Sequence, residues 1–184
     1  THAHIDHSGY IPLLVKNGFR GKIHCSHGTA ELCKILLPDS GYLQEEDARF
    51  ANKHGFSKHK PALPLYTLKD AEEALKYFHP LRFDHVFDLG QDLSFTLYPA
   101  GHILGASMIQ VRNGTTSLLF TGDLGRPHDL IMKPPESIEK TDYMVVESTY
   151  GNRLHATFDP KEELADVVNR TARRSEEHTS ELQS

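Results

Sequence analysis

Hydrophobic residues in the first third of the chain recur every three or four positions, which is the spacing of an amphipathic helix. The pattern predicts helices over residues 8–17, 29–37 and 45–54, and a short strand over residues 22–25. Thr29 is expected to cap the second helix. Pro38 is expected to end that helix, because proline cannot donate the next backbone hydrogen bond.

The hydrophobic period changes from helical to alternating in the middle of the chain. Residues 67–70 resemble a capping box and predict the start of another helix. Beyond it, apolar and polar residues alternate over 93–97, as in a strand with one buried face. The Asn113-Gly114 pair predicts a tight hairpin turn between two strands, at residues 108–112 and 117–121.

Two further elements complete the pattern. Residues 143–146 are expected to form a short buried strand. Residues 160–173 are expected to form a helix with three apolar side chains facing inward, Leu164, Val167 and Val168. Strands in the middle of the chain with helices before and after them predict a layered α/β protein.

The composition is that of an ordinary globular protein. The 184 residues are 38% hydrophobic and 24% charged, with a formal net charge of −5, and can form one domain with a sizeable core. No apolar run is long enough to span a membrane, so no membrane association is expected. Cys25 and Cys33 lie outside any CxxC motif and are expected to be buried free thiols in a reducing cytoplasm.

Four candidate metal ligands lie within six residues near the start of the chain: His2, His4, Asp6 and His7. In an extended segment His2 and His4 project to one side, where they can bind one cation, whereas Asp6 and His7 point to a neighbouring site. Imidazoles and a carboxylate without a nearby cysteine favour open, catalytic zinc sites. Two such cations can share a bridging hydroxide. The alternative is a chance group of surface histidines.

Three more candidates each follow a predicted strand, where a rigid scaffold often presents functional side chains. His102 lies in a loop of small residues, Asp123 follows a glycine, and Glu147 precedes the run STYG. Taken alone, His102 is more often structural and Asp123 could equally be a turn residue. Their order and their company with the first cluster favour a functional role.

Together these motifs resemble the metallo-β-lactamase superfamily. The run HAHIDH at residues 2–7 matches its HxHxDH signature, and His102 and Asp123 match its later single-His and single-Asp motifs. Glu147 with its STYG run is similar to the nucleic-acid-processing branch that carries a β-CASP insert. That branch includes bacterial ribonucleases and the endonuclease subunit of the messenger-RNA 3′-end cleavage complex. The resemblance covers residues 1 to about 170.

The resemblance implies a two-zinc ribonuclease that cleaves phosphodiester bonds by means of a metal-bridging hydroxide. By this resemblance His2, His4 and His102 hold one zinc, Asp6 and His7 hold the second, and Asp123 bridges the two. Glu147 would orient the general-acid side of the reaction without binding metal, so Asp6 and Glu147 are the two carboxylates with expected catalytic roles. RNA is the expected partner, DNA stays open as a substrate, and the oligomeric state is unknown.

The resemblance also implies that the chain is a truncated αββα sandwich with its β-CASP cap almost wholly missing. The expected division is a partial metallo-β-lactamase domain over 1–152, the start of the β-CASP region over 153–173, and a tail over 174–184. The tail resembles a translated sequencing adapter. Because strands, the cap and a final His ligand would be missing, we expect this chain alone to be inactive and the second zinc site to be incomplete.

Two other functions stay open beside the ribonuclease. One is a hydrolase of a small thioester or lactam substrate, against which the STYG run argues. The other is a non-catalytic RNA-binding paralogue, against which the retained ligands argue. A basic stretch could contact RNA phosphates, although a solvated loop is its more common interpretation; its residues are Lys53, His54, Lys58, His59 and Lys60.

Overall fold

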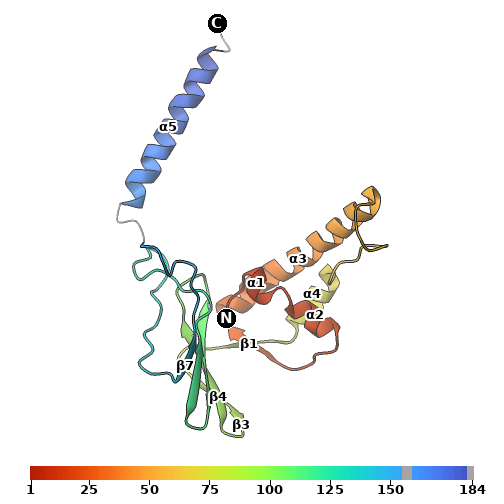
Figure 1. Cartoon of the computed structure of the whole chain (residues 1–184), viewed down its shortest axis with the longest axis vertical. Helices are drawn as coiled ribbons and strands as arrows, with labels where there is room; N and C mark the ends of the chain where they lie inside the picture. Colours follow the sequence, from red (N-terminus) through yellow and green to blue (C-terminus); the bar gives the residue numbers. More distant parts are fainter. Residues whose placement is uncertain (155–158, 182–184) are drawn as a thin grey trace. The chain divides into compact units, whose positions relative to one another are not determined.

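The computed structural model describes residues 1–154 and 159–181, and it places them in two compact units, Thr1–Glu147 and Ser148–Ser184 (Figure 1). The first unit is an α/β structure, as predicted. Its helices are α1 (Ile5–Ser8), α2 (Ile11–Lys16), α3 (His27–His54) and α4 (Leu68–Leu75). Its strands are β1 (Ile23–Ser26), β2 (Phe78–Leu81), β3 (Val86–Gly90), β4 (Leu93–Pro99), β5 (Ser107–Asn113), β6 (Thr116–Phe120) and β7 (Tyr143–Val145).

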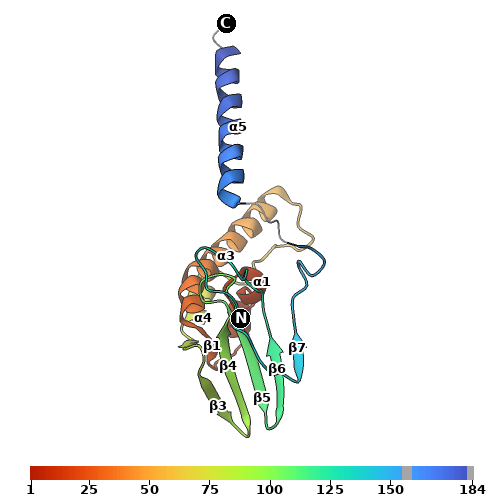
Figure 2. The same cartoon turned by 90° about the vertical axis from the view of Figure 1, so that its left-hand side faces the viewer.

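The strands form two sheets. β1 and β2 pair in parallel, and the larger sheet has the order β3-β4-β5-β6-β7, antiparallel except for the parallel pair β6–β7 (Figure 2). The predicted hairpin is confirmed, since Asn113 of β5 pairs with Thr116 of β6. The helices α1 to α4 lie on one side of the larger sheet (Figure 1). The full αββα sandwich stays a prediction.

One core cluster joins the helices to the start of the chain. Ala3, Cys33, Leu37, Tyr66 and Ala71 are all buried in it. Ala3 lies between the two histidines His2 and His4, so burial of its methyl group in the helical core fixes the backbone that carries both imidazoles.

The long helix α3 corrects the prediction for this region. Ser26, rather than Thr29, is the N-cap, and its side chain accepts a hydrogen bond from the Thr29 N–H. The helix continues through Pro38 to His54, so the predicted end at Pro38 is wrong. Proline removes one backbone hydrogen bond of the helix, but the packing of α3 outweighs this loss. At Gly41 the helix lies so close to the backbone of Thr67 that a Cβ added to Gly41 would be 2.7 Å from the Thr67 carbonyl oxygen.

Other local predictions had mixed outcomes. The capping box before α4 is confirmed, because the Thr67 side chain accepts from the Asp70 N–H and the Asp70 side chain accepts from the Thr67 N–H. The strand predicted at 143–146 forms as β7 at the edge of the sheet, but its side chains are exposed rather than buried. β2 and β3 were not predicted, because Pro80 and a Gly90 turn interrupt their apolar pattern.

In the second unit, α5 (Pro160–Glu181) is longer than the predicted helix over 160–173. The apolar side chains predicted to face inward, at Leu164, Val167 and Val168, are exposed. Among the described residues of this unit there is no second helix or strand against which they could pack. Residues 182–184 of the predicted tail lie outside the described residues. Within the described part of the chain, no helix is long and apolar enough to cross a membrane.

Both cysteines are free and buried, as predicted. Burial raises the pKa of the Cys25 thiol to about 12 and that of the Cys33 thiol to about 11. Because the thiolate is the reactive form, we expect iodoacetamide at pH 8 to alkylate both at least about 100-fold more slowly in the native chain than in guanidinium. Mass spectrometry of the labelled chain measures this. Rapid native labelling would contradict the buried positions.

Candidate metal centre

The first two histidines are held by a compact turn that leads into α1. His2 is buried, and His4 occupies the N-cap position of α1. The hydroxyl of Ser8 donates to the backbone carbonyls of Ala3, at 2.8 Å, and His4, at 3.0 Å. This turn places the two imidazoles on one side of the segment and leaves Asp6 and His7 on the exposed surface of α1.

His102 is presented by the loop between β4 and β5. The loop is closed by a hydrogen bond from the Ala100 N–H to the Ala106 carbonyl, at 2.9 Å. Its Gly105 carbonyl accepts hydrogen bonds from the hydroxyls of Ser26 and Thr29 at the start of α3. Gly105 adopts a φ of 78°, in the left-handed region that favours glycine. The start of α3 therefore fixes the loop that carries His102.

Asp123 follows β6, and its loop is held by Glu147. A carboxylate oxygen of Glu147 accepts a hydrogen bond from the Leu124 N–H at 2.7 Å, one residue beyond Asp123. The Glu147 N–H in turn donates to the Thr121 hydroxyl at 3.4 Å. Glu147 therefore contacts the backbone beside a candidate ligand. Its predicted role on the general-acid side of the reaction stays a prediction.

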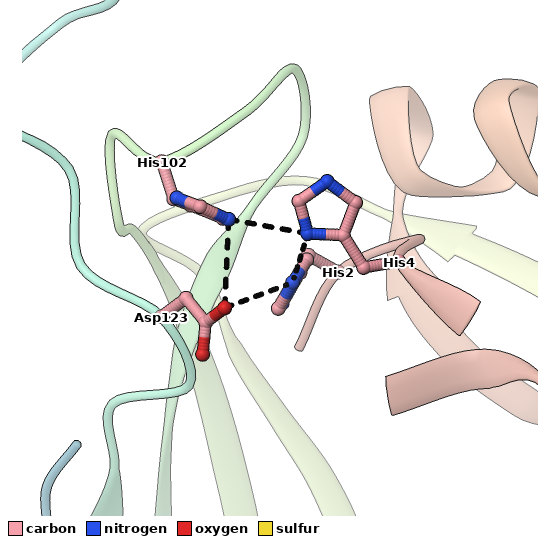
Figure 3. A group of neighbouring side chains, drawn as sticks. All are labelled: His2, His4, His102 and Asp123. Carbon is pink, nitrogen blue, oxygen red and sulfur yellow. Dashed lines mark hydrogen bonds and ion pairs between the residues drawn. The ribbon is translucent and has the colours of Figure 1, made fainter. Parts of the chain in front are cut away.

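His2, His4, His102 and Asp123 converge on one point (Figure 3). Their ligand atoms all lie within 4.8 Å of one another. Nδ1 of His4 lies 3.0 Å from Nε2 of His2 and 3.2 Å from Nε2 of His102. Oδ2 of Asp123 lies 3.6 Å from Nε2 of His2 and 3.5 Å from Nε2 of His102. Zinc–ligand bonds of about 2.0–2.1 Å separate neighbouring ligand atoms by about 3.3 Å, so these four distances of 3.0–3.6 Å suit ligands that share one zinc ion.

A second group of donors lies beside this cluster. Nε2 of His7 is 3.3 Å from Oδ1 of Asp123 and 3.5 Å from Oδ2 of Asp6. The two oxygens of Asp123 thus face different donor sets, Oδ2 toward His2 and His102 and Oδ1 toward His7. A carboxylate in this position is suited to bridge two cations.

The electrostatics of His2 suit a metal ligand. Burial, reinforced by the neighbouring His7 and opposed by the carboxylate of Asp123, lowers the pKa of His2 to about 4. His2 is therefore neutral at pH 7, which is the form of imidazole that binds a metal. Its solvent exposure is only 2%, so few water molecules would compete for its nitrogen.

No family model matches the chain. Three similar proteins are a ribonuclease, TTHA0252 of Thermus thermophilus, and the transcription termination factors FttA of Lokiarchaeum and of Methanocaldococcus jannaschii. They are 28%, 30% and 31% identical to this chain over 93–95% of its length. Similarity over nearly the whole chain is far more extended than one shared motif.

These relatives are members of the β-CASP branch of the metallo-β-lactamase superfamily, the branch that the motifs of this chain resemble. The chain covers 36% of the length of the ribonuclease and 26% of each of the two termination factors. The structure brings together the ligands predicted for the first zinc and places Asp6 and His7 beside them.

Sequence reasoning missed the residues that hold the ligand loops in this chain. Ser26 and Thr29 bind the loop of His102, and Ser8 holds the turn of His2 and His4. Serine is one of the preferred N-cap residues, so its place just before a predicted helix could have identified Ser26 as the N-cap. It could not have revealed Gly105, which lies 79 residues away from Ser26 in sequence.

Proposed function

We propose that the protein carrying this chain is a zinc-dependent ribonuclease. The observation that carries the proposal is the convergence of three imidazole nitrogens and one carboxylate oxygen, from His2, His4, His102 and Asp123, within 4.8 Å of one another. The similarity to a protein named as a ribonuclease and to transcription termination factors supports RNA as the substrate. The free cysteines suit a reducing compartment such as the cytoplasm.

In this proposal the chain's own residues have separate roles. His2, His4 and His102 would hold the first zinc, Asp6 and His7 would hold the second, and Asp123, whose two oxygens face the two donor groups, would contribute to both. Bound zinc lowers the pKa of water and stabilises negative charge on phosphate oxygens. The burial of His2 keeps its imidazole neutral and excludes water. Glu147 holds the loop of Asp123 through the Leu124 N–H, so that the carboxylate stays oriented toward both donor groups.

The same proposal includes the architecture. Residues 1–152 would be part of an αββα metallo-β-lactamase domain, residues 153–173 the start of the β-CASP region, and residues 174–184 a tail derived from an adapter. The five-stranded mixed sheet with helices on one side is compatible with the first assignment.

The alternative functions predict different substrates. A small-substrate hydrolase would cleave a β-lactam or an acyl thioester but not RNA. A non-catalytic RNA-binding paralogue would bind RNA without cleaving it. The convergence of the four ligand atoms argues against the non-catalytic alternative, because a protein that binds RNA alone does not need these four side chains to converge.

The test is zinc removal from the protein that carries this chain. A chelator is expected to abolish cleavage of a labelled single-stranded RNA, and added Zn²⁺ is expected to restore it, because the metal supplies the nucleophile and the charge stabilisation. A chromogenic β-lactam and an acyl thioester serve as comparison substrates. Cleavage of either small substrate without cleavage of RNA would contradict the proposal, as would RNA cleavage that persists in the absence of bound metal.

A further inference from the structure

The end of α3 and the loop after it form a basic region that the metal centre does not use. We call residues 49–62 the α3 tip; it lies at the end of α3 that is farther from the larger sheet (Figure 1). Between Ala48 and Lys69 the chain has no Asp or Glu, but five cations, Arg49, Lys53, Lys58, Lys60 and Lys69. Arg49 forms an ion pair with Glu46, so the positive charge of the α3 tip is carried by Lys53, Lys58 and Lys60.

The α3 tip also exposes a group of aromatic rings. The ring centroids of Phe50 and His54 lie 4.1 Å apart, and those of Phe50 and Phe56 lie 5.5 Å apart. Phe50 is 56% exposed and Phe56 is 65% exposed. Large apolar rings that contact one another in solvent, next to lysines, are a suitable surface for the stacking of nucleobases.

The loop of the α3 tip is held in a defined conformation. Gly55 ends α3 in the left-handed conformation with a φ of 72°. The Asn52 side chain donates to the Ala62 carbonyl at 2.9 Å and accepts from the Ala62 N–H at 2.7 Å. The end of α3 and the loop after it enclose a pocket of about 340 Å³, whose lining includes Asn52, His59 and Lys60. A surface ordered in this way loses little conformational entropy when it binds a ligand.

We propose that the α3 tip is a binding site for single-stranded RNA, separate from the metal centre. Bases stack on Phe50 and Phe56, and the phosphates lie along Lys53, Lys58 and Lys60. Single-stranded rather than double-stranded RNA fits, because only unpaired bases can turn their faces to aromatic side chains. The charge of the lysines complements the phosphate backbone.

The position of the α3 tip gives this site a function beyond that of the metal centre. α3 begins where Ser26 and Thr29 bind the loop of His102, and its 28 residues at about 1.5 Å each extend over about 42 Å. An RNA bound at the α3 tip is therefore held at a distance from the site of cleavage. Such a contact selects substrates with an unpaired segment on one side of the cleaved bond.

The test measures the binding of a fluorescein-labelled 15-nucleotide oligouridine to the 184-residue chain by anisotropy, in EDTA. EDTA makes the result independent of zinc and of the proposed nuclease activity. The double variant Phe50→Ala/Phe56→Ala is expected to weaken binding about 10-fold or more. Lys58→Ala/Lys60→Ala is expected to reduce the slope of log K against log[salt] by about 1.4, since each single-strand phosphate contact contributes about 0.7.

A charge-matched control is Lys22→Ala/Lys133→Ala, which removes two exposed lysines outside the α3 tip and should leave the salt slope unchanged. Circular dichroism confirms that each variant folds. An equal loss of binding in the control and in the lysine variant would overturn the proposal, because it would indicate a general charge effect. Unchanged RNA binding by the phenylalanine variant would also overturn it. If that variant instead lost self-association in sedimentation, the exposed rings would be a contact between copies of the chain.

Discussion

If Asp123 bridges the two zinc ions proposed above, replacing it with alanine is expected to empty both sites in the protein that carries this chain. One oxygen of Asp123 lies 3.5 Å and 3.6 Å from the nitrogens of His102 and His2, and the other lies 3.3 Å from that of His7. Loss of a residue that merely supports a ligand lowers metal affinity about 10- to 100-fold, so loss of this ligand should lower the affinity of each site by at least about 100-fold. RNA cleavage should fall with the metal content.

Three single variants make this expectation specific. Zinc per chain is measured by inductively coupled plasma mass spectrometry after dialysis. His102→Ala should lower the zinc content of the first site and His7→Ala that of the second site. Asp123→Ala should lower the zinc content of both sites. His27→Ala, which removes an exposed histidine outside the cluster, should retain the unaltered metal content. If Asp123→Ala lost no more zinc than His7→Ala, the bridging role would be wrong.

Local chemistry explains why the ligand set could be predicted from the sequence. Two of the four converging side chains, His2 and His4, lie two residues apart in a short motif. The other two each follow a predicted strand, His102 after the alternating pattern at 93–97 and Asp123 after the hairpin strand at 117–121. The capping box of α4 and the Asn113-Gly114 turn were predictable for the same reason, because the residues that determine each are neighbours in the chain.

Contacts between distant segments explain what the sequence did not reveal. Pro38 is a local signal for the end of a helix, but α3 continues because it packs closely on the start of α4 at Gly41. The apolar run of β7 indicated a buried strand, but burial depends on what lies beside a strand, and β7 is at the edge of its sheet. The support of the His102 loop by Ser26 joins residues too far apart for any periodicity to connect.

Gly105 carries that support, and Gly105→Ala is expected to lower the free energy of unfolding by about 2–5 kcal/mol. An alanine Cβ there would lie 2.2 Å from the Thr29 nitrogen and 2.6 Å from the Ser26 hydroxyl oxygen. The left-handed φ of 78° costs a non-glycine residue about 1–2 kcal/mol, and forcing a methyl group into a packed contact costs about 1–3 kcal/mol more.

The matched control is Gly114→Ala in the hairpin turn. Gly114 also has a left-handed φ, 57°, but an added Cβ would meet no atom within 4 Å, so only the backbone term of about 1–2 kcal/mol applies. Urea unfolding in EDTA measures both variants without a contribution from metal. Because the clash at Gly105 displaces the loop of His102, Gly105→Ala should also weaken zinc binding, whereas Gly114→Ala should not. Equal destabilisation by the two substitutions would show that the start of α3 does not hold the loop of His102. The position of His102 would then have to be fixed by other contacts.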